Sequence, residues 1–176
     1  DVLLTLSFLA KDMIIQQGGI GLVIIAMDTF NGNEKIRQKG CSILALFAST
    51  GQAEVLFSIG EHGIDVCVHA LEDFKNNVAI QTDACRALYH LSKVADRDMR
   101  DRISAQGGLM LLVNAITTYM DEINLVEAAC SALENLSIDA EEQVLVDLNV
   151  VETVIAVMKR YSTSEKLQEK SLGVLK

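Results

Sequence analysis

The side chains best suited to nucleophilic or metal chemistry are the cysteines and histidines. All four cysteines lie inside apolar segments, and neither CxxC nor Cys/His ligand spacing occurs among them. We therefore expect buried free thiols that pack as small hydrophobic groups. Thiols kept free are typical of a reducing compartment, so we expect the protein in the cytoplasm, with the nucleus as an alternative. The four are Cys41, Cys67, Cys85 and Cys130.

The closest approach to a nucleophile–base pair in the sequence is Cys85 followed by His90. Five residues along a helix amount to about 500°, so these side chains would point about 140° apart and could not touch. No two histidines stand four residues apart, which makes a zinc site improbable. His62 is interpreted as a residue at the end of a helix, and His69 as a surface or boundary residue.

Two further segments resemble functional motifs only superficially. The glycines from Gly18 to Gly21 lack the Lys-Ser/Thr that follows in a phosphate-binding loop. The charge-alternating stretch 96–102 is interpreted as a solvated loop and helix start. We therefore predict no catalytic residues, no cofactor, no metal and no small-molecule substrate, and hence no enzyme.

Composition favours helices and disfavours two classes of partner. The 176 residues include no proline, 50% are hydrophobic and 5% are aromatic, which favours an all-α fold. The net charge of −9 argues against nucleic acid and acidic membrane surfaces as partners. No apolar run reaches the roughly 18 residues of a membrane span.

The elements that must position any site repeat along the chain. Gly19, Gly63, Gly108 and Val150 are separated by 44, 45 and 42 residues, and the same steps align five further columns. One column holds four of the eight aromatic residues, which argues for a structural repeat. The columns are Ala26, Ala70, Ala115 and Val157; Phe30, Phe74, Tyr119 and Tyr161; Ile36, Ile80, Leu125 and Leu167; Cys41, Cys85, Cys130 and Leu172; and Leu44, Leu88, Leu133 and Leu175.

Each unit is predicted to contain three helices. A short first helix ends at the glycine break, where a left-handed residue stops it. A second helix runs to the aromatic residue, and the third follows a polar link. Asn33, Asn77 and Ser164 are the predicted N-caps of the third helices, and Asp121 is preferred over Glu122 in the third unit.

These helices predict a right-handed α-solenoid, because stacked units bury the apolar faces that single units leave open. The predicted units are 1–50, 51–94, 95–138 and 139–176, the last one truncated. Residues 1–11 have an ambiguous register. Since the chain opens at Asp1 and stops inside a helical pattern, we expect a fragment of a longer protein, whose open ends could associate end to end.

The helix pattern, the Gly-Gly-Ile and Gly-Gly-Leu breaks and the segment 130–137 (CSALENLS) resemble the armadillo repeat family across nearly the whole chain. The aromatic closing the second helix and the stretch 164–169 also resemble the armadillo segment of large leucine-rich-repeat kinases. The family resemblance implies a concave groove, lined by third helices, that binds a protein or peptide. The family's Trp and Asn ladder is mostly absent here: only Asn135 remains, so basic nuclear-localisation peptides are not expected to bind.

The predicted function is a protein-interaction scaffold, and the alternative is a regulatory or structural segment that mediates assembly or positions a catalytic domain elsewhere in the same polypeptide. The predicted groove residues lie on the polar face of the third helices, where Arg86 could hold a carboxylate through two hydrogen bonds. They are Gln38, Ser42, Arg86, His90, Glu127, Ser131 and Asn135.

Overall fold

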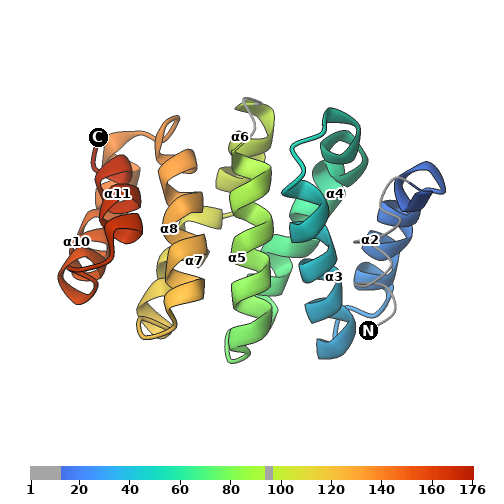
Figure 1. Ribbon diagram of the computed structural model, residues 1–176, viewed down its shortest axis with the longest axis horizontal. Helices are drawn as coiled ribbons and strands as arrows, with labels where there is room; N and C mark the ends of the chain where they lie inside the picture. The colour runs from blue at the N-terminus through green and yellow to red at the C-terminus, as the bar shows by residue number, and fades with distance from the viewer. Residues whose placement is uncertain (1–12, 94–96) are drawn as a thin grey trace.

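The computed structural model describes residues 13–93 and 97–176, and these fold into helices without any strand. The helices form successive layers along one axis, with the described ends of the chain at opposite ends of the row (Figure 1). The predicted all-α solenoid is confirmed; residues 1–11, whose register the sequence left open, lie outside the described part. The helices are α2 (Gly19–Thr29), α3 (Glu34–Ala48), α4 (Ala53–Asp73), α5 (Val78–Ser92), α6 (Arg97–Ala105), α7 (Gly108–Thr118), α8 (Ile123–Ser137), α9 (Glu142–Asp147), α10 (Val150–Arg160) and α11 (Glu165–Val174).

The second helices of the repeats begin and end in the same way. Helices α2, α7 and α10 each follow a residue in the left-handed conformation, namely Gly18, Gly107 and Asn149 with φ of 70°, 78° and 56°. At their other end stands an aromatic residue whose backbone N–H binds the carbonyl four residues earlier, and α4 ends in the same way. The aromatic column is therefore a recurring helix terminus, as the repeat register predicted.

The second repeat breaks at a different place from the one predicted. There the first and second helices merge into α4 across a kink at Gly60, with φ 51° and ψ −159°, while Gly63 lies inside the helix. His62 is consequently an exposed residue just after the kink and not the end of a helix. Glycine adopts this backbone conformation without steric cost, and the helix therefore breaks at Gly60 and not at the predicted Gly63.

The third helices show three of the four predicted N-caps. Side chains of Asn33, Asn77 and Ser164 accept hydrogen bonds from the backbone N–H three residues on, at 3.1, 3.2 and 3.4 Å. The prediction for the third repeat was wrong. Glu122 occupies the N-cap position without a side-chain cap, and Asp121 instead binds Arg160 at 2.8 Å.

In three of the four repeats, a side chain of the third helix donates hydrogen bonds to backbone carbonyls at or just after the end of the preceding second helix. Gln81 Nε2 donates to the carbonyls of Leu71 and Phe74, and Gln168 Nε2 donates to those of Met158 and Tyr161. Arg37 takes this place in the first repeat and donates to the carbonyls of Asn31 and, in the following layer, Val66. The third repeat has Val126 here, a side chain that donates no hydrogen bond.

The core continues from layer to layer, as expected when each repeat covers its neighbour. In the first three repeats the apolar columns of the third helices are buried, except Ile36, which is partly exposed. On the second helices Ala70 and Ala115 are buried and Ala26 is partly exposed, while the aromatic column is partly exposed at Phe74 and Tyr119 and exposed at Phe30. In the fourth repeat Leu167 is buried, while Leu172 and Leu175 are exposed. Their register is as predicted, and their exposure follows from their place on the outer side of the last layer.

Candidate partner-binding face

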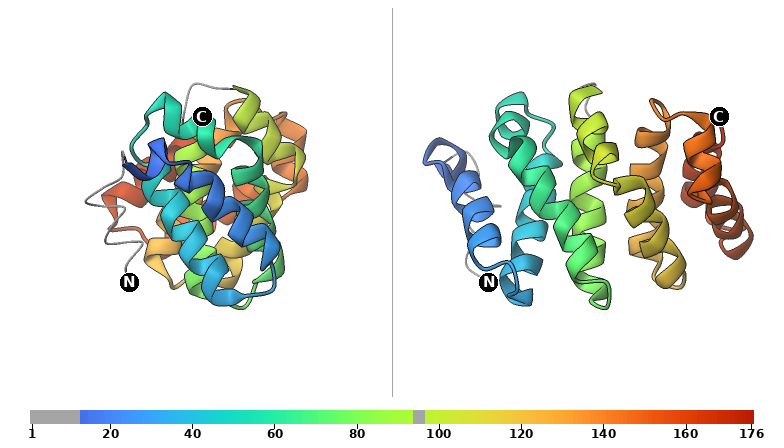
Figure 2. Two further views of the ribbon diagram at one scale, coloured as in Figure 1. Left: turned by 90° about the vertical axis from the view of Figure 1, so that its right-hand side faces the viewer. Right: turned by 180° about the vertical axis from the view of Figure 1, so that it is seen from behind.

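The predicted strip lies on helices α3, α5 and α8, which stand side by side with α11 along one face of the row (Figure 1). The second helices α2, α7 and α10, with the C-terminal half of α4, lie on the opposite side (Figure 2). Side chains at equivalent positions of successive third helices can therefore contact one extended ligand.

On α3, the two predicted residues are available to solvent. Gln38 is exposed and Ser42 is partly exposed. Both lie on the helix that is capped by Asn33. They contribute uncharged polar groups to the N-terminal part of the strip.

Helix α5 carries the cationic centre of the strip. The side chain of Arg86 is 46% exposed and lies 3.5 Å from Asp83, a long contact that engages one guanidinium nitrogen. Burial raises the pKa of Asp83, and the charge of Arg86 opposes that rise. Arg86 therefore keeps donors directed to solvent that a partner carboxylate can reach.

His90 is half-buried beside Tyr89, with ring centroids 4.7 Å apart. Burial lowers the pKa of His90, and the positive charges of Lys93 and Arg86 lower it further. The imidazole is therefore neutral at pH 7 and can both donate and accept a hydrogen bond.

The residues on α8 are largely engaged within the protein. Glu127 pairs with Lys166 at 2.6 Å, and Ser131 is 3% exposed with its hydroxyl bonded to the Glu127 carbonyl. Asn135 donates through Nδ2 to the carbonyl of Tyr89 and the hydroxyl of Ser92, at 3.3 and 3.1 Å. Ser131 therefore has almost no surface to offer a partner, and Asn135 fixes α8 against the end of α5.

Sequence reasoning missed two lysines on this face. The ammonium of Lys93 lies 6.0 Å from the Tyr89 ring centroid, and Lys170 pairs with Glu134 at 3.0 Å. Lys93 follows His90 by three residues, and this helical spacing could have predicted that Lys93 lies on the same face as His90. Lys170 could not have been found in this way, because its partner lies on the neighbouring helix.

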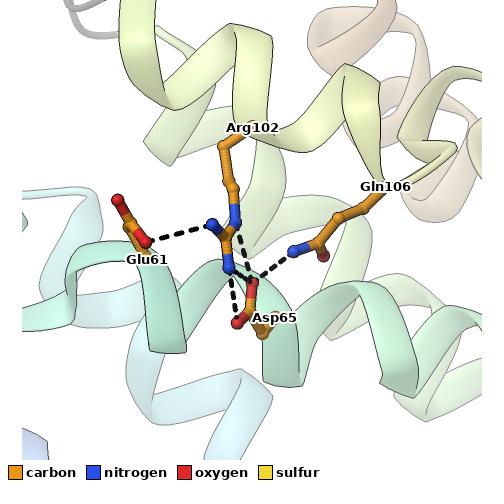
Figure 3. Close-up of polar contacts among 4 residues, drawn as sticks. All are labelled: Glu61, Asp65, Arg102 and Gln106. Carbon is orange, nitrogen blue, oxygen red and sulfur yellow. Dashed lines mark hydrogen bonds and ion pairs between the residues drawn. The ribbon is translucent and has the colours of Figure 1, made fainter.

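The charge-alternating stretch 96–102 was interpreted as a solvated loop and helix start, and its residues 97–102 begin α6. Arg102 donates to both oxygens of Asp65 and to Glu61 on α4, and Gln106 also binds Asp65 (Figure 3). In the other direction, Arg100 pairs with Asp139, which lies between α8 and α9. Helix α6 thus links three consecutive repeats through ion pairs, and Asp96 lies outside the described residues.

The cysteines offer no reactive group. All four are free and buried, as predicted. Burial raises the pKa of Cys130 to about 12 and that of Cys85 well above its ordinary range. Their thiols stay protonated and are poor nucleophiles at neutral pH.

In residues 13–93 and 97–176 no three His, Cys, Asp or Glu side chains gather as metal ligands would. Nor does any helix in those ranges combine the length and apolar character that crossing a bilayer requires.

The geometry is that of a known repeat family, since a family model described as "LRRK2 ARM repeat" matches residues 16–176. The chain belongs to this family. A crystal structure of an engineered protein, Northeast Structural Genomics Consortium target OR329, superposes with a TM-score of 0.74 at 23% sequence identity. The match covers 92% of the present chain and 63% of the engineered chain, and shows a shared fold. The predicted armadillo fold and the resemblance to the kinase armadillo segment are both confirmed.

Proposed function

We propose that this chain is a protein-interaction scaffold that binds an extended protein segment across the third helices, which form a concave groove. The family supports a scaffold role, because stacked repeats present one long continuous surface. The proposal requires no catalytic step, cofactor, metal, nucleic acid or membrane, and it places the protein in the cytoplasm or nucleus. The free buried thiols support a reducing compartment.

The observation that carries the proposal is the exposed guanidinium of Arg86 in the middle of the strip. It lies near neutral His90 and the ammonium of Lys93, in a protein whose net charge is −9. A local cationic site in an acidic protein favours a partner segment that bears a carboxylate at this point. The rest of the segment would contact Gln38, Ser42 and the outer atoms of Glu127 and Asn135. Ser131 would support these residues without contacting the segment.

The test compares partner capture by the wild-type chain and by the double variant Arg86→Glu/His90→Ala, using extract from the protein's own cells. Arg86→Glu reverses the charge where the carboxylate would bind, so captured partners should decrease at least about tenfold. The matched control is Lys159→Glu, an exposed cation on second helix α10, which should leave capture unchanged. If the double variant captured as much partner as the Lys159→Glu control, the strip would not be the binding surface.

A second candidate is a structural segment that holds a catalytic domain elsewhere in the polypeptide at a fixed position. The ion pairs of α6, which reach α4 on one side and Asp139 on the other, favour a stiff spacer. On this proposal Arg86→Glu/His90→Ala would have no effect in the longer protein, whereas breaking the α6 ion pairs would alter its activity.

We also propose that the repeats divide at residues 50/51, 94/95 and 138/139 and belong to a longer protein. Two of these divisions fall in described turns, between α3 and α4 and between α8 and α9. Limited proteolysis that cut inside α5 or α8 before these turns would contradict the division.

A further inference from the structure

A hollow of about 200 Å³ lies where α4 and α7 pack together, on the side of the row opposite the third helices (Figure 2). Its buried wall is formed by the apolar side chains of Leu71 on α4 and of Leu111 and Ala115 on α7. We call this hollow the α4–α7 pocket. An apolar ligand group that enters it displaces water from these three side chains.

Gln81 on α5 also lines the pocket and supplies an unused acceptor. Its side chain is 3% exposed, and Nε2 donates to the carbonyls of Leu71 and Phe74 at 2.9 and 3.2 Å. These bonds fix the orientation of the amide and satisfy the carbonyls at the end of α4. The other amide atom, Oε1, accepts no hydrogen bond from the described residues. A ligand N–H in the pocket would satisfy this oxygen.

The mouth of the pocket is polar. Lys75, Asn114 and Thr118 are exposed there, and their side chains form no hydrogen bond or ion pair within residues 13–93 and 97–176. No acidic side chain lines the pocket. The pocket therefore offers one positive charge, one buried acceptor and an apolar wall, without a negative charge.

This combination is specific to the joint between the second and third repeats. At the position of Gln81, the first and third repeats have Arg37 and Val126, and neither side chain has an acceptor atom. At the position of Lys75 the same two repeats have an asparagine and a methionine. The pocket is therefore not a by-product of the repeat pattern.

We propose that the α4–α7 pocket binds the C-terminal residue of a partner protein, and that this residue is apolar. Its carboxylate pairs with the ammonium of Lys75, and its backbone N–H donates to Gln81 Oε1. Its side chain packs on Leu71 and Leu111. Because the volume lies below the roughly 300–1,000 Å³ of pockets for drug-sized ligands, the pocket suits a single residue.

Only two kinds of ligand carry a carboxylate, an N–H and an apolar side chain on one carbon atom. One is the last residue of a chain, and the other is a free amino acid. A free amino acid also carries an ammonium group, for which the lining holds no carboxylate. The exposed mouth leaves room for a preceding peptide unit, whose polar groups Asn114 and Thr118 can bind. These features favour the end of a chain.

The proposal does not depend on the partner strip, since the pocket and the strip share no residue. Loss of binding at Arg86 and His90 would leave the pocket intact, and blocking the pocket would leave the strip intact. The two proposals can therefore fail separately.

The experiment measures fluorescence anisotropy of a labelled glycine–serine peptide that ends in leucine with a free carboxylate. The probe should bind the wild-type chain saturably. The same peptide with an amidated C-terminus should bind at least about tenfold more weakly, because amidation removes the charge that pairs with Lys75.

Two variants of the chain test the pocket itself. Lys75→Glu should weaken binding of the free-carboxylate peptide more than about tenfold, because it replaces an attractive charge by a repulsive one. The matched control is Lys159→Glu on α10, which changes the net charge equally and should leave binding unchanged. Both lysines are exposed, so these variants should fold, which circular dichroism would verify.

A third variant should strengthen binding, a result that damage to the fold cannot produce. Asn114→Lys adds a second cation at the mouth and should tighten binding of the free-carboxylate peptide about threefold, as an exposed ion pair does. The amidated peptide should show no such gain.

Four outcomes would overturn the proposal. The first is the absence of saturable binding up to millimolar peptide. The second is equal binding of the amidated peptide, which would show that the carboxylate is not recognised. Binding weakened equally by Lys75→Glu and Lys159→Glu would show a general charge effect. Displacement of the probe by free leucine as effectively as by unlabelled peptide would identify the occupant as a free amino acid.

Discussion

The hydroxyl of Tyr119 donates a hydrogen bond to the backbone carbonyl of Lys75, which belongs to the preceding repeat, over 2.8 Å. The same relationship recurs one repeat later, where Tyr161 donates to the carbonyl of Met120 over 2.7 Å. In the second repeat the column holds Phe74, whose ring instead lies 5.8 Å from the guanidinium of Arg37. The aromatic column thus ends each second helix, and its members in the second, third and fourth repeats also contact the layer before.

Removing one of these hydroxyls should destabilise the stack modestly. Tyr161→Phe keeps the ring and loses the bond to Met120, which should cost about 0.5–1.5 kcal/mol of unfolding free energy. Urea unfolding measures the change. Tyr161→Leu, which loses the ring as well, should cost more. A Tyr161→Phe variant as stable as the wild-type chain would show that the hydroxyl contributes nothing.

The missing cap of α8 offers a stabilising substitution. Glu122 stands at the N-cap with no side-chain cap, whereas Asn33 and Asn77 cap the equivalent helices. Glu122→Asn should therefore raise the unfolding free energy by about 0.5–1 kcal/mol, and Asn77→Ala should lower it by about 1 kcal/mol. Thermal unfolding tests both, and a Glu122→Asn variant no more stable than Glu122→Ala would contradict the capping argument.

The ion pairs between α6 and α4 should show in both stability and salt dependence. Arg102→Lys keeps the charge but loses the two-pronged contact with Asp65. Because the Arg102 side chain is 37% exposed, we expect a loss of only about 1 kcal/mol. Hydrogen exchange should quicken in α6 and around residue 65. Arg97→Lys, on an exposed pair within α6, is the control and should change neither.

The raised thiol pKa values predict a loss of stability in alkali. In the unfolded chain Cys130 ionises near its ordinary pKa of 9.0, while in the folded protein its pKa is about 12. Its contribution to stability is therefore complete below pH 9 and falls between pH 9 and 12, by up to about 1.4 kcal/mol per pH unit.

Unfolding by urea at pH 8 and at pH 10 measures this loss. The variant Cys85→Ala/Cys130→Ala should lose less stability than the wild-type chain over the same interval, because two of the thiols with raised pKa values are gone. Equal losses would contradict the assignment.

The native thiols should also resist a thiol reagent at pH 7 and react after unfolding, since all four are buried.

Much of the fold could be predicted from the sequence because it depends on local features with a strict period. The aromatic termini and the caps Asn33, Asn77 and Ser164 follow from spacing and residue type alone. The kink of α4 could not be placed in this way, because Gly60 and Gly63 are both able to adopt unusual backbone angles and tertiary packing selected the first.

The candidate site was less predictable, because exposure depends on which side chains the neighbouring layers present. Arg86 is exposed, but Ser131, at the equivalent position one repeat on, is buried. Similarly, the acceptors of Arg102 lie 37 and 41 residues earlier in the chain, a separation that no helical spacing reveals.

Val126 interrupts the series in which Arg37, Gln81 and Gln168 bind carbonyls at the ends of second helices. At this position α8 packs against α7 through apolar contacts, without the side-chain hydrogen bond to a carbonyl that the other repeats have. Packing tolerates small sliding movements, whereas hydrogen bonds to fixed carbonyls resist them. If the row of helices bends, we expect the hinge to lie between α7 and α8, so that the repeats on either side move as rigid bodies.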